Sequence, residues 1–405
     1  MGYTGIAIKG VSWIAALRVC TRFVTFMRTA ILARLLSPAQ FGVFGVASLF
    51  LALLEIITET GINIFLVQEK KNIKEYINSA WIVSIARGTL LATAIFASST
   101  LIGYFFRSPQ SIPVIQMIAL VPLIRGFINP AIIIYQKELQ FHNEFWLRLV
   151  LFLVDSSVAI LAAFIFRNAA SFVFGLLAGV CLEVVLSFVI IKPRPKLHFE
   201  FEKVKEIFHK GKWVTLLGVF SYFAKEGDSI AVGKILGTTS LGFYNVAYKF
   251  STLPLSEITD VINRVVFPVY TKFSDDKKRL WEAFFKTSIV NHLASLVFGL
   301  ALFIFAREVI LLFLGDMWIN IVPIIKILAV YGILRAIFGT FSPLFLALGR
   351  QDYVASMTFV RLSGLAITIV PFIMVYGIIG AGYSAIVSIL VEIPLIFYFV
   401  LKVFK

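Results

Sequence analysis

The feature that most constrains this chain is the recurrence of apolar stretches about 20 residues long, separated by short polar links. A helix of that length crosses a hydrocarbon layer of about 30 Å. Apolar stretches become helices there because a helix satisfies its own backbone hydrogen bonds without water. Composition agrees, since 60% of the 405 residues are hydrophobic and 15% are charged, with a mean hydropathy of +0.93. The chain is predicted to be an all-α, polytopic membrane protein.

About 12 transmembrane helices are predicted from these stretches. Lysine and arginine collect in the links on one side, led by KKNIK at 70–74, the stretch 192–212 and DDKKR at 275–279. Because basic links mark the cytoplasmic side, both termini are predicted to be cytoplasmic in a multi-pass protein of the inner (cytoplasmic) cell membrane. The net charge of +15 is in part this topology signal. No soluble domain is expected that could bind nucleic acid. The helices are predicted at residues 10–33, 41–67, 78–104, 113–135, 145–166, 171–191, 213–235, 241–269, 284–306, 319–346, 354–375 and 378–401.

The chain also resembles itself at a shift of 200 residues. Twelve of the 51 residues from Trp13 to Asn63 are identical to their counterparts from Trp213 to Asn263, without a gap. Near the ends of the two copies, LEVVLSF at 182 aligns with VEIPLIF at 391. Two pseudo-symmetric six-helix lobes in the same orientation are therefore predicted, a plan on which secondary transporters are built. The domains are predicted as an N-terminal lobe 1–191, a basic cytoplasmic linker 192–212 and a C-terminal lobe 213–405.

Several predicted helices carry charges that lipid does not tolerate. Lys225, Glu226 and Asp228 lie in the middle of the stretch 213–235. Three charges near a helix centre cost about 8–10 kcal/mol, whereas the apolar residues of that helix return only about 3–6 kcal/mol. Such helices must turn their charges toward other helices or a hydrated cavity. Further charges of this kind are Arg18, Arg22, Arg28, Glu55, Glu59, Arg125, Arg148, Asp155, Glu183, Lys249, Glu257, Asp260, Arg264, Arg335, Arg361 and Glu392.

Two interpretations of these charges are open. Each charge could be neutralised by a neighbour: Lys225 by Asp228, and an arginine of the first helix by Glu55 or Glu59. Alternatively, a solvated cavity between the two halves holds them, which explains why the first, second, seventh and eighth helices, made equivalent by the repeat, are rich in charge. Arg87 is expected at an interface, where its long side chain reaches water.

Three segments carry a family resemblance. RTAILARLLSPAQFGVFGVASLFLALLEIITETGINIFLVQEK, residues 28–70, resembles the first two helices of the polysaccharide flippase family in the multidrug/oligosaccharidyl-lipid/polysaccharide exporter superfamily. The likeness continues in KILGTTSLGFYNVAYKF, 234–250, and in LALGRQDYVASMTFVRLSG, 346–364. It implies a two-lobe transporter of helices 1 to 6 and 7 to 12. It also implies a polyprenyl-diphosphate-linked oligosaccharide as substrate, moved from the inner to the outer face by alternating access for surface polysaccharide biosynthesis.

A substrate of this kind needs fixed cations, because its diphosphate has to leave water. Arginine is suited to this role, since its planar fork binds phosphate bidentately and stays protonated. Carboxylates nearby could couple the movement of H+ or Na+ to the transport step, and the sequence does not choose among them. The substrate-binding candidates are Arg18, Arg22, Arg28, Lys225, Lys249 and Arg264, and the ion-coupling candidates are Glu55, Glu59, Asp228, Glu257 and Asp260.

Two other functions are weighed against the flippase. A multidrug or organic-cation antiporter of the same superfamily would need an acidic cavity, and the arginines of the first helix disfavour it. A polysaccharide polymerase or glycosyltransferase would need catalytic carboxylates or histidines on a sizeable hydrophilic loop, and the outward links are short. We therefore expect no enzyme activity, no cofactor and no metal site. The expected partners are the lipid-linked glycan, membrane lipids, a polymerase and glycosyltransferases, with the transporter itself a monomer.

Overall fold

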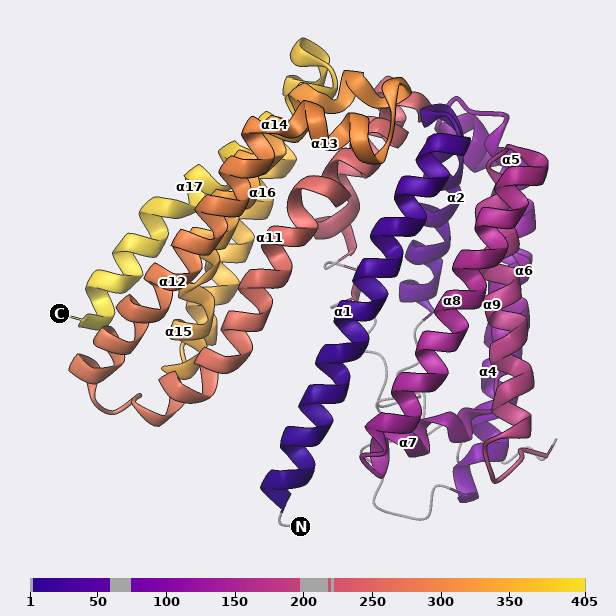
Figure 1. Ribbon diagram of the computed structural model, residues 1–405, viewed down its shortest axis with the longest axis horizontal. Helices are drawn as coiled ribbons and strands as arrows, with labels where there is room; N and C mark the ends of the chain where they lie inside the picture. The colour runs from indigo at the N-terminus through magenta and orange to yellow at the C-terminus, as the bar shows by residue number, and fades with distance from the viewer. Residues whose placement is uncertain (1–2, 59–73, 197–217, 220–221, 405) are drawn as a thin grey trace. The chain divides into compact units, whose positions relative to one another are not determined.

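The computed structural model describes residues 3–58, 74–196, 218–219 and 222–404, and every regular element in those ranges is a helix (Figure 1). The chain divides into two compact units, Met1–Glu226 and Gly227–Lys405. The predicted lobes, 1–191 and 213–405, stay a prediction, because much of the segment between them lies outside the described ranges. The all-α membrane class is confirmed for the described residues.

Eight described helices are long and apolar enough to span a membrane, or nine if one bent pair counts as a span. The bent pair is Ser111–Arg125 with Pro130–Lys137, at an angle of 74°. The long helices α1 (Tyr3–Leu35) and α11 (Thr238–Lys272) are not among the eight, and both carry several of the predicted intramembrane charges. The total of twelve stays a prediction. The eight are Pro38–Ile57, Tyr76–Phe105, Phe141–Phe166, Ala170–Val189, Lys277–Ile304, Asp316–Ala347, Gln351–Tyr376 and Ile378–Phe404.

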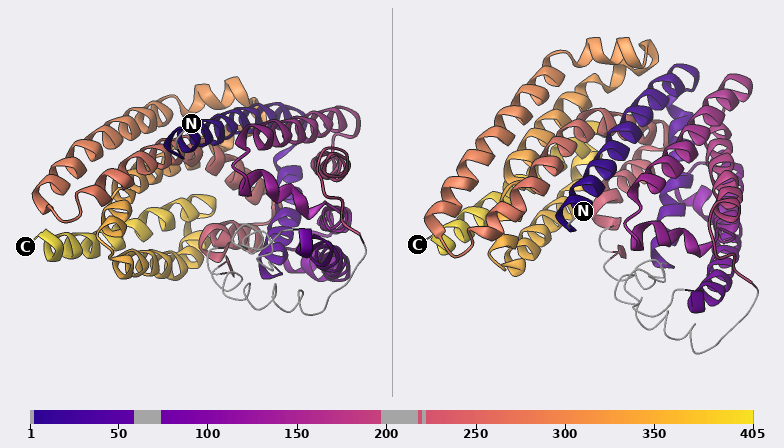
Figure 2. Two further views of the ribbon diagram at one scale, coloured as in Figure 1. Left: turned by 90° about the horizontal axis from the view of Figure 1, so that it is seen from below. Right: turned by 60° about the horizontal axis from the view of Figure 1, so that its bottom comes forward.

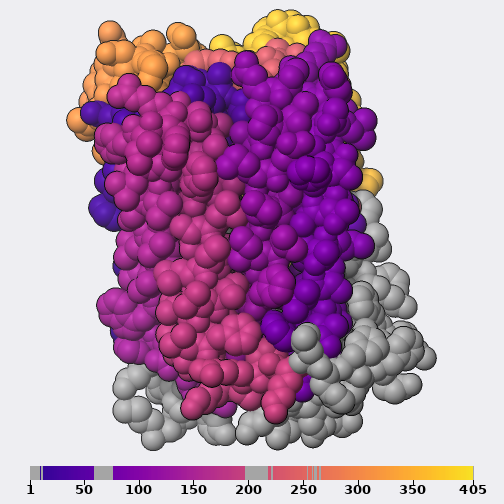
Figure 3. All heavy atoms as spheres, turned by 90° about the vertical axis from the view of Figure 1, so that its right-hand side faces the viewer, coloured from indigo at the N-terminus to yellow at the C-terminus, as the bar shows by residue number. Residues whose placement is uncertain are grey.

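The first unit is built from long helices packed side by side, with α1 and α8 running parallel. Within it α8 packs along α9, α1 lies on α8, and α4 lies against α5 and α6. Figure 3 shows one face of this unit, where side chains of α8 and α9 (magenta) lie beside those of α4 and α6 (purple). Large apolar side chains such as Leu101 and Val189 are exposed on α4 and α9, as expected for surfaces that meet lipid. Besides α1, the elements are α2 (Pro38–Ile57), α4 (Lys74–Phe105), α5 (Ser111–Ile118), α6 (Leu120–Arg125), η1 (Pro130–Ile133), α7 (Ile134–Lys137), α8 (Phe141–Phe166) and α9 (Ala170–Val189).

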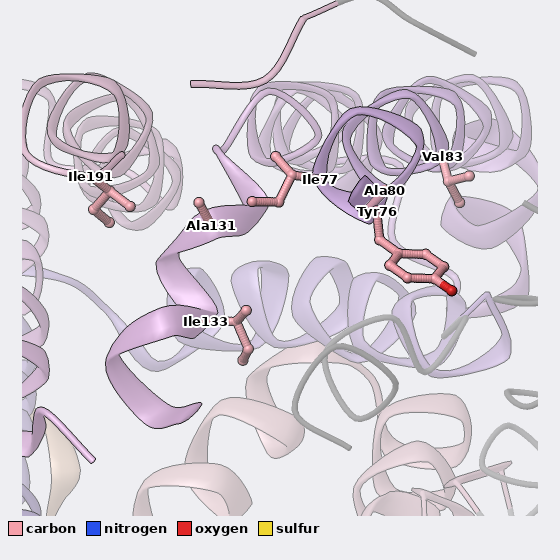
Figure 4. Packing of buried hydrophobic residues seen from close by; sticks show 7 residues of the cluster. All are labelled: Tyr76, Ile77, Ala80, Val83, Ala131, Ile133 and Ile191. Carbon is pink, nitrogen blue, oxygen red and sulfur yellow. The ribbon is translucent and has the colours of Figure 1, made fainter. Parts of the chain in front are cut away.

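The sharp bend after α6 is held by one polar side chain and an apolar cluster. Asn129 is fully buried; its side chain accepts a hydrogen bond from the backbone N–H of Ala131 at 3.0 Å, and its own N–H donates to Ser187 Oγ at 3.0 Å. These bonds satisfy backbone groups that the break in the helix would leave unpaired. Figure 4 shows the residues packed around the bend from α4, η1 and the end of the α9 segment. The cluster is Tyr76, Ile77, Ala80, Val83, Ala131, Ile133 and Ile191.

The second unit repeats the pattern of long helices joined by short ones. In it α16 packs along α17, and α14 contacts α11, α12 and α17. Figure 2 shows α16 and α17, in gold and yellow, running beside each other. Residues 222–236, which bridge the two units along the chain, are also helical. The labelled elements after α11 are α12 (Lys277–Ile304), α13 (Ala306–Phe313), η2 (Asp316–Ile321), α14 (Val322–Gly339), α15 (Phe341–Ala347), α16 (Gln351–Tyr376) and α17 (Ile378–Phe404).

Two helix starts agree with the predicted shift of 200 residues. The residue that caps α2 is Ser37, and the residue that caps α11 is Gly237. At Ser37 the backbone N–H donates to Gln40 Oε1 at 2.9 Å, and Pro38 begins the helix with its φ angle already set. The apolar pairs between two and three turns further on are equally buried: Val46 and Val246, and Ala47 and Ala247, are all 0% exposed.

The contact between α8 and α9 depends on two glycines one turn apart. A Cβ added at Gly175 would lie 2.5 Å from the main-chain oxygen of Asp155, and one at Gly179 would lie 3.1 Å from Asp155 Cβ. Small residues at this spacing let two membrane helices approach backbone to backbone. Because the atom nearest to Gly175 belongs to the main chain of α8, it cannot rotate away from an added methyl group.

We predict that Gly175→Ala destabilises the protein by about 1–3 kcal/mol, the usual cost of overpacking. The measurement is thermal unfolding of the purified full chain in detergent, followed by intrinsic fluorescence. Gly227→Ala is the matched control, because no described atom lies within 4 Å of its added Cβ. Equal unfolding midpoints for the two variants would contradict the packing described here.

Candidate functional site

Ion pairs and polar clusters inside each unit form the candidate site. In the first unit, Arg28 of α1 donates to Asp155 of α8, with 2.8 Å between Nη1 and Oδ2. Both side chains are nearly buried, at 13% and 12% exposed. Asp155 Oδ1 is buried and makes no hydrogen bond to the described part of the chain. A buried charge is retained only when it is paired, so this bond fixes α1 against α8.

A second cluster joins α2, α4 and α6 around Glu55. Its Oε1 accepts a hydrogen bond from Arg125 Nη1 at 2.5 Å. Arg87 binds the same turn by a different route, with its Nη2 donating to the main-chain oxygen of Glu55 at 2.7 Å and its Nε donating to Thr58 Oγ1 at 3.2 Å. Thr58 is the C-cap of α2, so Arg87 lies at the negative end of that helix dipole. The expectation that Arg87 reaches an interface is replaced by this contact between two helices.

One ion pair has a counterpart in each unit. Arg148 of α8 lies 3.4 Å from Glu183 of α9, and Arg361 of α16 lies 3.5 Å from Glu392 of α17. The two glutamates occupy the same position in the alignment of LEVVLSF with VEIPLIF. The second helix pair therefore repeats the bond of the first. Arg148 also lies 4.0 Å from Glu144, one turn earlier on its own helix.

The second unit buries the carboxylate of Asp228 among neutral donors. Asp228 is 8% exposed; its Oδ2 accepts a hydrogen bond from the hydroxyl of Tyr244 at 2.7 Å, and its Oδ1 accepts from the backbone N–H of Ser229 at 2.7 Å. The predicted pairing of Asp228 with Lys225 is not formed. Lys225 is exposed, and the hydroxyl of Tyr244, which is fully buried, takes the place that an ammonium group would fill.

Arg335 of α14 is bound by hydroxyl groups. Its Nη1 donates to the Tyr248 hydroxyl at 3.1 Å and to the Tyr331 hydroxyl at 3.4 Å. Tyr244 and Tyr248 are one turn apart on α11. The hydroxyl of Tyr244 binds Asp228, and the hydroxyl of Tyr248 binds Arg335. The side chain of Arg335 is exposed even though it belongs to an apolar helix.

The structure separates the predicted site residues into several groups. Arg28 binds Asp155 and Glu55 binds Arg125, so among the pairings left open between arginines of the first helix and Glu55 or Glu59, that of Arg28 with Glu55 is not formed. Both residues have other partners within the same unit. Arg18 and Glu257 are half-buried, and Arg22, Lys225 and Lys249 are exposed. Glu59 lies outside the described residues, and the side chains of Asp260 and Arg264 on α11 are likewise not described. Whether the six cations bind substrate and the five carboxylates couple an ion stays a prediction.

An apolar recess of about 660 Å³ lies between α4, α5 and α6, and it contains none of the predicted site residues. Gln116, one of its few polar side chains, is bonded to Ser99 Oγ at 3.3 Å. Among the described residues, no three His, Cys, Asp or Glu side chains are grouped closely enough to hold a metal ion. The lining of this recess is therefore suited to apolar groups. It lies within the first unit.

The tyrosine partners carry no formal charge, so a pattern of charged residues does not reveal them. A usable signal was present in the repeat. At a shift of 210 residues, Pro113, Ala119 and Arg125 of the α5–α6 segment align with Pro323, Ala329 and Arg335 of α14. This alignment would have placed Arg125 and Arg335 at one equivalent position in the two halves.

Comparisons with known proteins point to one family. A family model described as polysaccharide biosynthesis protein matches residues 31–323. The lipopolysaccharide biosynthesis protein WzxC of Escherichia coli K12 is 25% identical over 347 residues, which cover 85% of this chain and 70% of WzxC. An uncharacterized membrane protein in the cps region of Klebsiella pneumoniae is 26% identical over 402 residues, covering 98% and 82% of the two chains.

Solved structures share the fold at low identity. The lipid II flippase MurJ, in an inward closed conformation, matches with a TM-score of 0.75 and 16% identity over 96% of this chain and 88% of MurJ. An inward-facing multidrug resistance MATE family transporter of the MOP superfamily matches with a TM-score of 0.67 and 14% identity over 95% and 94% of the two chains. At such identities the likeness establishes the polytopic helical fold alone.

We predict that Asp155→Asn destabilises the protein by about 3–5 kcal/mol, because it leaves the nearly buried Arg28 without its counter-charge. The double variant Arg28→Gln with Asp155→Asn should recover part of that loss, since neither charge then remains unpaired. Chemical or thermal unfolding of the full chain gives both values. Asp352→Asn is the control, because its pair with Arg350 is 63% and 42% exposed and should contribute no more than about 1 kcal/mol. With Arg28→Gln also measured alone, strict additivity of the two single changes would contradict the pairing.

Proposed function

Because this chain belongs to the polysaccharide biosynthesis protein family, we propose that it is a flippase for polyprenyl-diphosphate-linked oligosaccharides. In this role it moves such units from the inner to the outer face of the cell membrane for surface polysaccharide biosynthesis. The chain itself is a multi-pass membrane protein. The names of its relatives, among them a lipopolysaccharide biosynthesis protein and a succinoglycan biosynthesis transport protein, support this substrate class.

The observation that carries the proposal is the number of arginines on the helices of a chain of this family. Arg18, Arg22 and Arg28 follow one another on α1, and Arg125 and Arg335 lie on α6 and α14. Arginine stays charged in a low-dielectric setting and binds phosphate with two parallel hydrogen bonds. A diphosphate that leaves water needs such groups, because each lost hydration contact has to be replaced.

The proposed architecture has about twelve spans in two six-helix lobes, with both termini cytoplasmic. Alternating access by a rocking of the lobes then carries the head group across. Arg28, bound to Asp155, positions α1. The charge that meets the substrate is supplied by Arg18, Arg22, Lys225, Lys249 and Arg264. We take the transporter to act as a monomer in the inner membrane. Its functional partners are then a polymerase and the glycosyltransferases that build the substrate.

Among the carboxylate candidates, we assign ion coupling to Asp228. Its oxygens are bonded by the Tyr244 hydroxyl and the Ser229 N–H, which are neutral donors. A carboxylate held in this way can exchange a proton or take a sodium ion without breaking an ion pair. Glu55, by contrast, is bound to the guanidinium of Arg125. Binding of H+ or Na+ at Asp228 would change the charge inside the second unit, which can bias its conformation.

Drug export is the competing function, because MATE transporters share the fold. Fold does not decide cargo. A cationic drug would be repelled by arginine-rich helices, whereas an anionic lipid-linked glycan is attracted to them. The charge of the membrane helices therefore favours the flippase.

The decisive experiment is translocation of a fluorescent lipid-linked oligosaccharide in proteoliposomes that contain the purified protein. We expect the wild type to expose the label to an external quencher, and an imposed H+ or Na+ gradient to raise the rate. Asp228→Asn should lower the gradient-driven rate about 5-fold or more, the range of a typical coupling free energy. Glu282→Gln, an exposed carboxylate on α12, should behave as wild type.

Each arm of this experiment has its own negative outcome. Absence of translocation by the folded wild type would reject the flippase. Wild-type coupling in Asp228→Asn would reject only the assignment of Asp228.

A further inference from the structure

Arg125 is an arginine whose hydrogen-bonding fork is only partly used. It is the last residue of α6, about 21 Å along the span that begins at Ser111. In the described part of the chain its one partner is Glu55, which binds Nη1. The side chain of Arg125 is 44% exposed and that of Glu55 is 29% exposed. An arginine so placed cannot face hydrocarbon without a cost of about 2.5–3.5 kcal/mol, so the open side of the fork faces water or a ligand.

The carboxylate of Glu55 can leave Arg125 without unfolding the end of α2. Arg87 holds the main-chain oxygen of Glu55 and the hydroxyl of Thr58, and neither bond involves the carboxylate. Thr58 also donates to the main-chain oxygen of Leu54 at 2.7 Å. The turn that carries Glu55 is therefore fixed by its backbone, and a change of the Glu55 rotamer would break none of these bonds.

The second unit has an arginine at the equivalent position. At the shift of 210 residues Arg125 aligns with Arg335, and the residues before it match in burial: Ile115 and Ile325 are both 0% exposed, and Ala119 and Ala329 are 3% and 0% exposed. Both arginines have exposed side chains and are held by the helix that follows Ser37 or Gly237. On α2 the holding group is the carboxylate of Glu55, and on α11 it is the hydroxyl of Tyr248.

The other described ion pairs of the first unit lack this openness. Arg28 is 13% exposed, so its fork has little room for a further ligand. Arg148 is 45% exposed, but it faces two carboxylates, Glu144 and Glu183, which would repel an anion. Arg125 combines exposure with a single carboxylate partner. Its surroundings are thus the most favourable of the three pairs for a second, competing anion.

We propose that Arg125 and Arg335 each provide, within their own unit, a binding group for a phosphate of the substrate, and that Glu55 occupies Arg125 until a phosphate displaces it. This assignment rests on the proposed flippase function. Exchange of one oxyanion for another keeps the guanidinium paired at every stage, which avoids the cost of a bare charge in the membrane. A phosphate has the further advantage that it can engage the fork bidentately. In Arg335 the neutral tyrosine hydroxyls yield to the phosphate in the same way.

Binding of geranylgeranyl diphosphate to the purified full chain in phosphatidylcholine nanodiscs tests the proposal. We expect Arg125→Gln to weaken the affinity about tenfold, since a charge-assisted hydrogen bond is lost. Arg335→Gln should have a similar effect. Glu55→Gln should tighten binding several-fold, because the competing carboxylate is removed. Arg125→Lys, which keeps the charge but not the fork, should fall between wild type and Arg125→Gln.

Arg148→Gln is the matched control, because Arg148 has nearly the same exposure as Arg125 and is also paired with glutamate. It should bind the diphosphate as wild type does. Geranylgeraniol, which lacks the diphosphate, separates binding of the tail from binding of the head group, and its affinity should be unchanged in every variant. Monodisperse elution and an unchanged unfolding midpoint establish that each variant is folded.

The outcomes separate the two claims. A wild-type protein that binds the alcohol as tightly as the diphosphate would count against the proposed substrate class. A wild type that prefers the diphosphate, with Arg125→Gln and Arg335→Gln unaltered, would overturn the assignment of the arginines and leave the flippase standing. Weaker binding by folded Glu55→Gln would overturn the displacement of Glu55.

Discussion

The need to pair every charge within an apolar surrounding governs this structure. In each described unit, charged side chains on one helix are matched by carboxylates or hydroxyls on another helix. The matching is specific in position, because a long side chain on a rigid helix reaches only a few places on its neighbour. Apolar packing alone distinguishes poorly between possible helix neighbours in a membrane, because the lipid is as apolar as the helix surfaces. The polar bonds therefore select which helices meet.

The two halves of the internal repeat share one of these polar contacts and differ in another. The bond between Arg148 and Glu183 recurs as Arg361 with Glu392, so the last two helices of each half meet in the same way. At the equivalent arginines of α6 and α14, the partner has changed from a carboxylate to two phenols. The two halves thus share their helix starts and their packing, but they differ in the chemistry of one polar contact. A difference of this kind lets similar units answer differently to the same ligand.

The fold class and most helix positions could be predicted from the sequence, because both depend on local composition. The stretches predicted at 145–166, 171–191, 354–375 and 378–401 agree with α8, α9, α16 and α17 to within a few residues. The stretch 113–135 was expected to be one helix, and the structure breaks it near Asn129, whose buried bonds to distant residues no local pattern reveals.

Partners across helices were harder to predict for the same reason. The pairing of Arg28 with Asp155 joins residues 127 positions apart, and its geometry depends on how α1 lies on α8. The tyrosine hydroxyls were not predicted as partners of Asp228 and Arg335, because tyrosine is common in membrane helices and carries no charge. Only the finished packing shows that Tyr244 approaches Asp228 and that Tyr248 approaches Arg335. Alignment of the two copies at a shift of 210 residues, in addition to 200, would have identified Arg125 and Arg335 as equivalent positions.

The glycines of α9 have a mechanical consequence. With Gly175 and Gly179 against Asp155, the backbones of α8 and α9 are too close to slide past each other without a clash. Since α1 is tied to the same point of α8 through Arg28, these three helices form a stiff block. A conformational change of the first unit would therefore leave α1, α8 and α9 fixed relative to one another, and the movement would occur in the segments that connect them to the other helices.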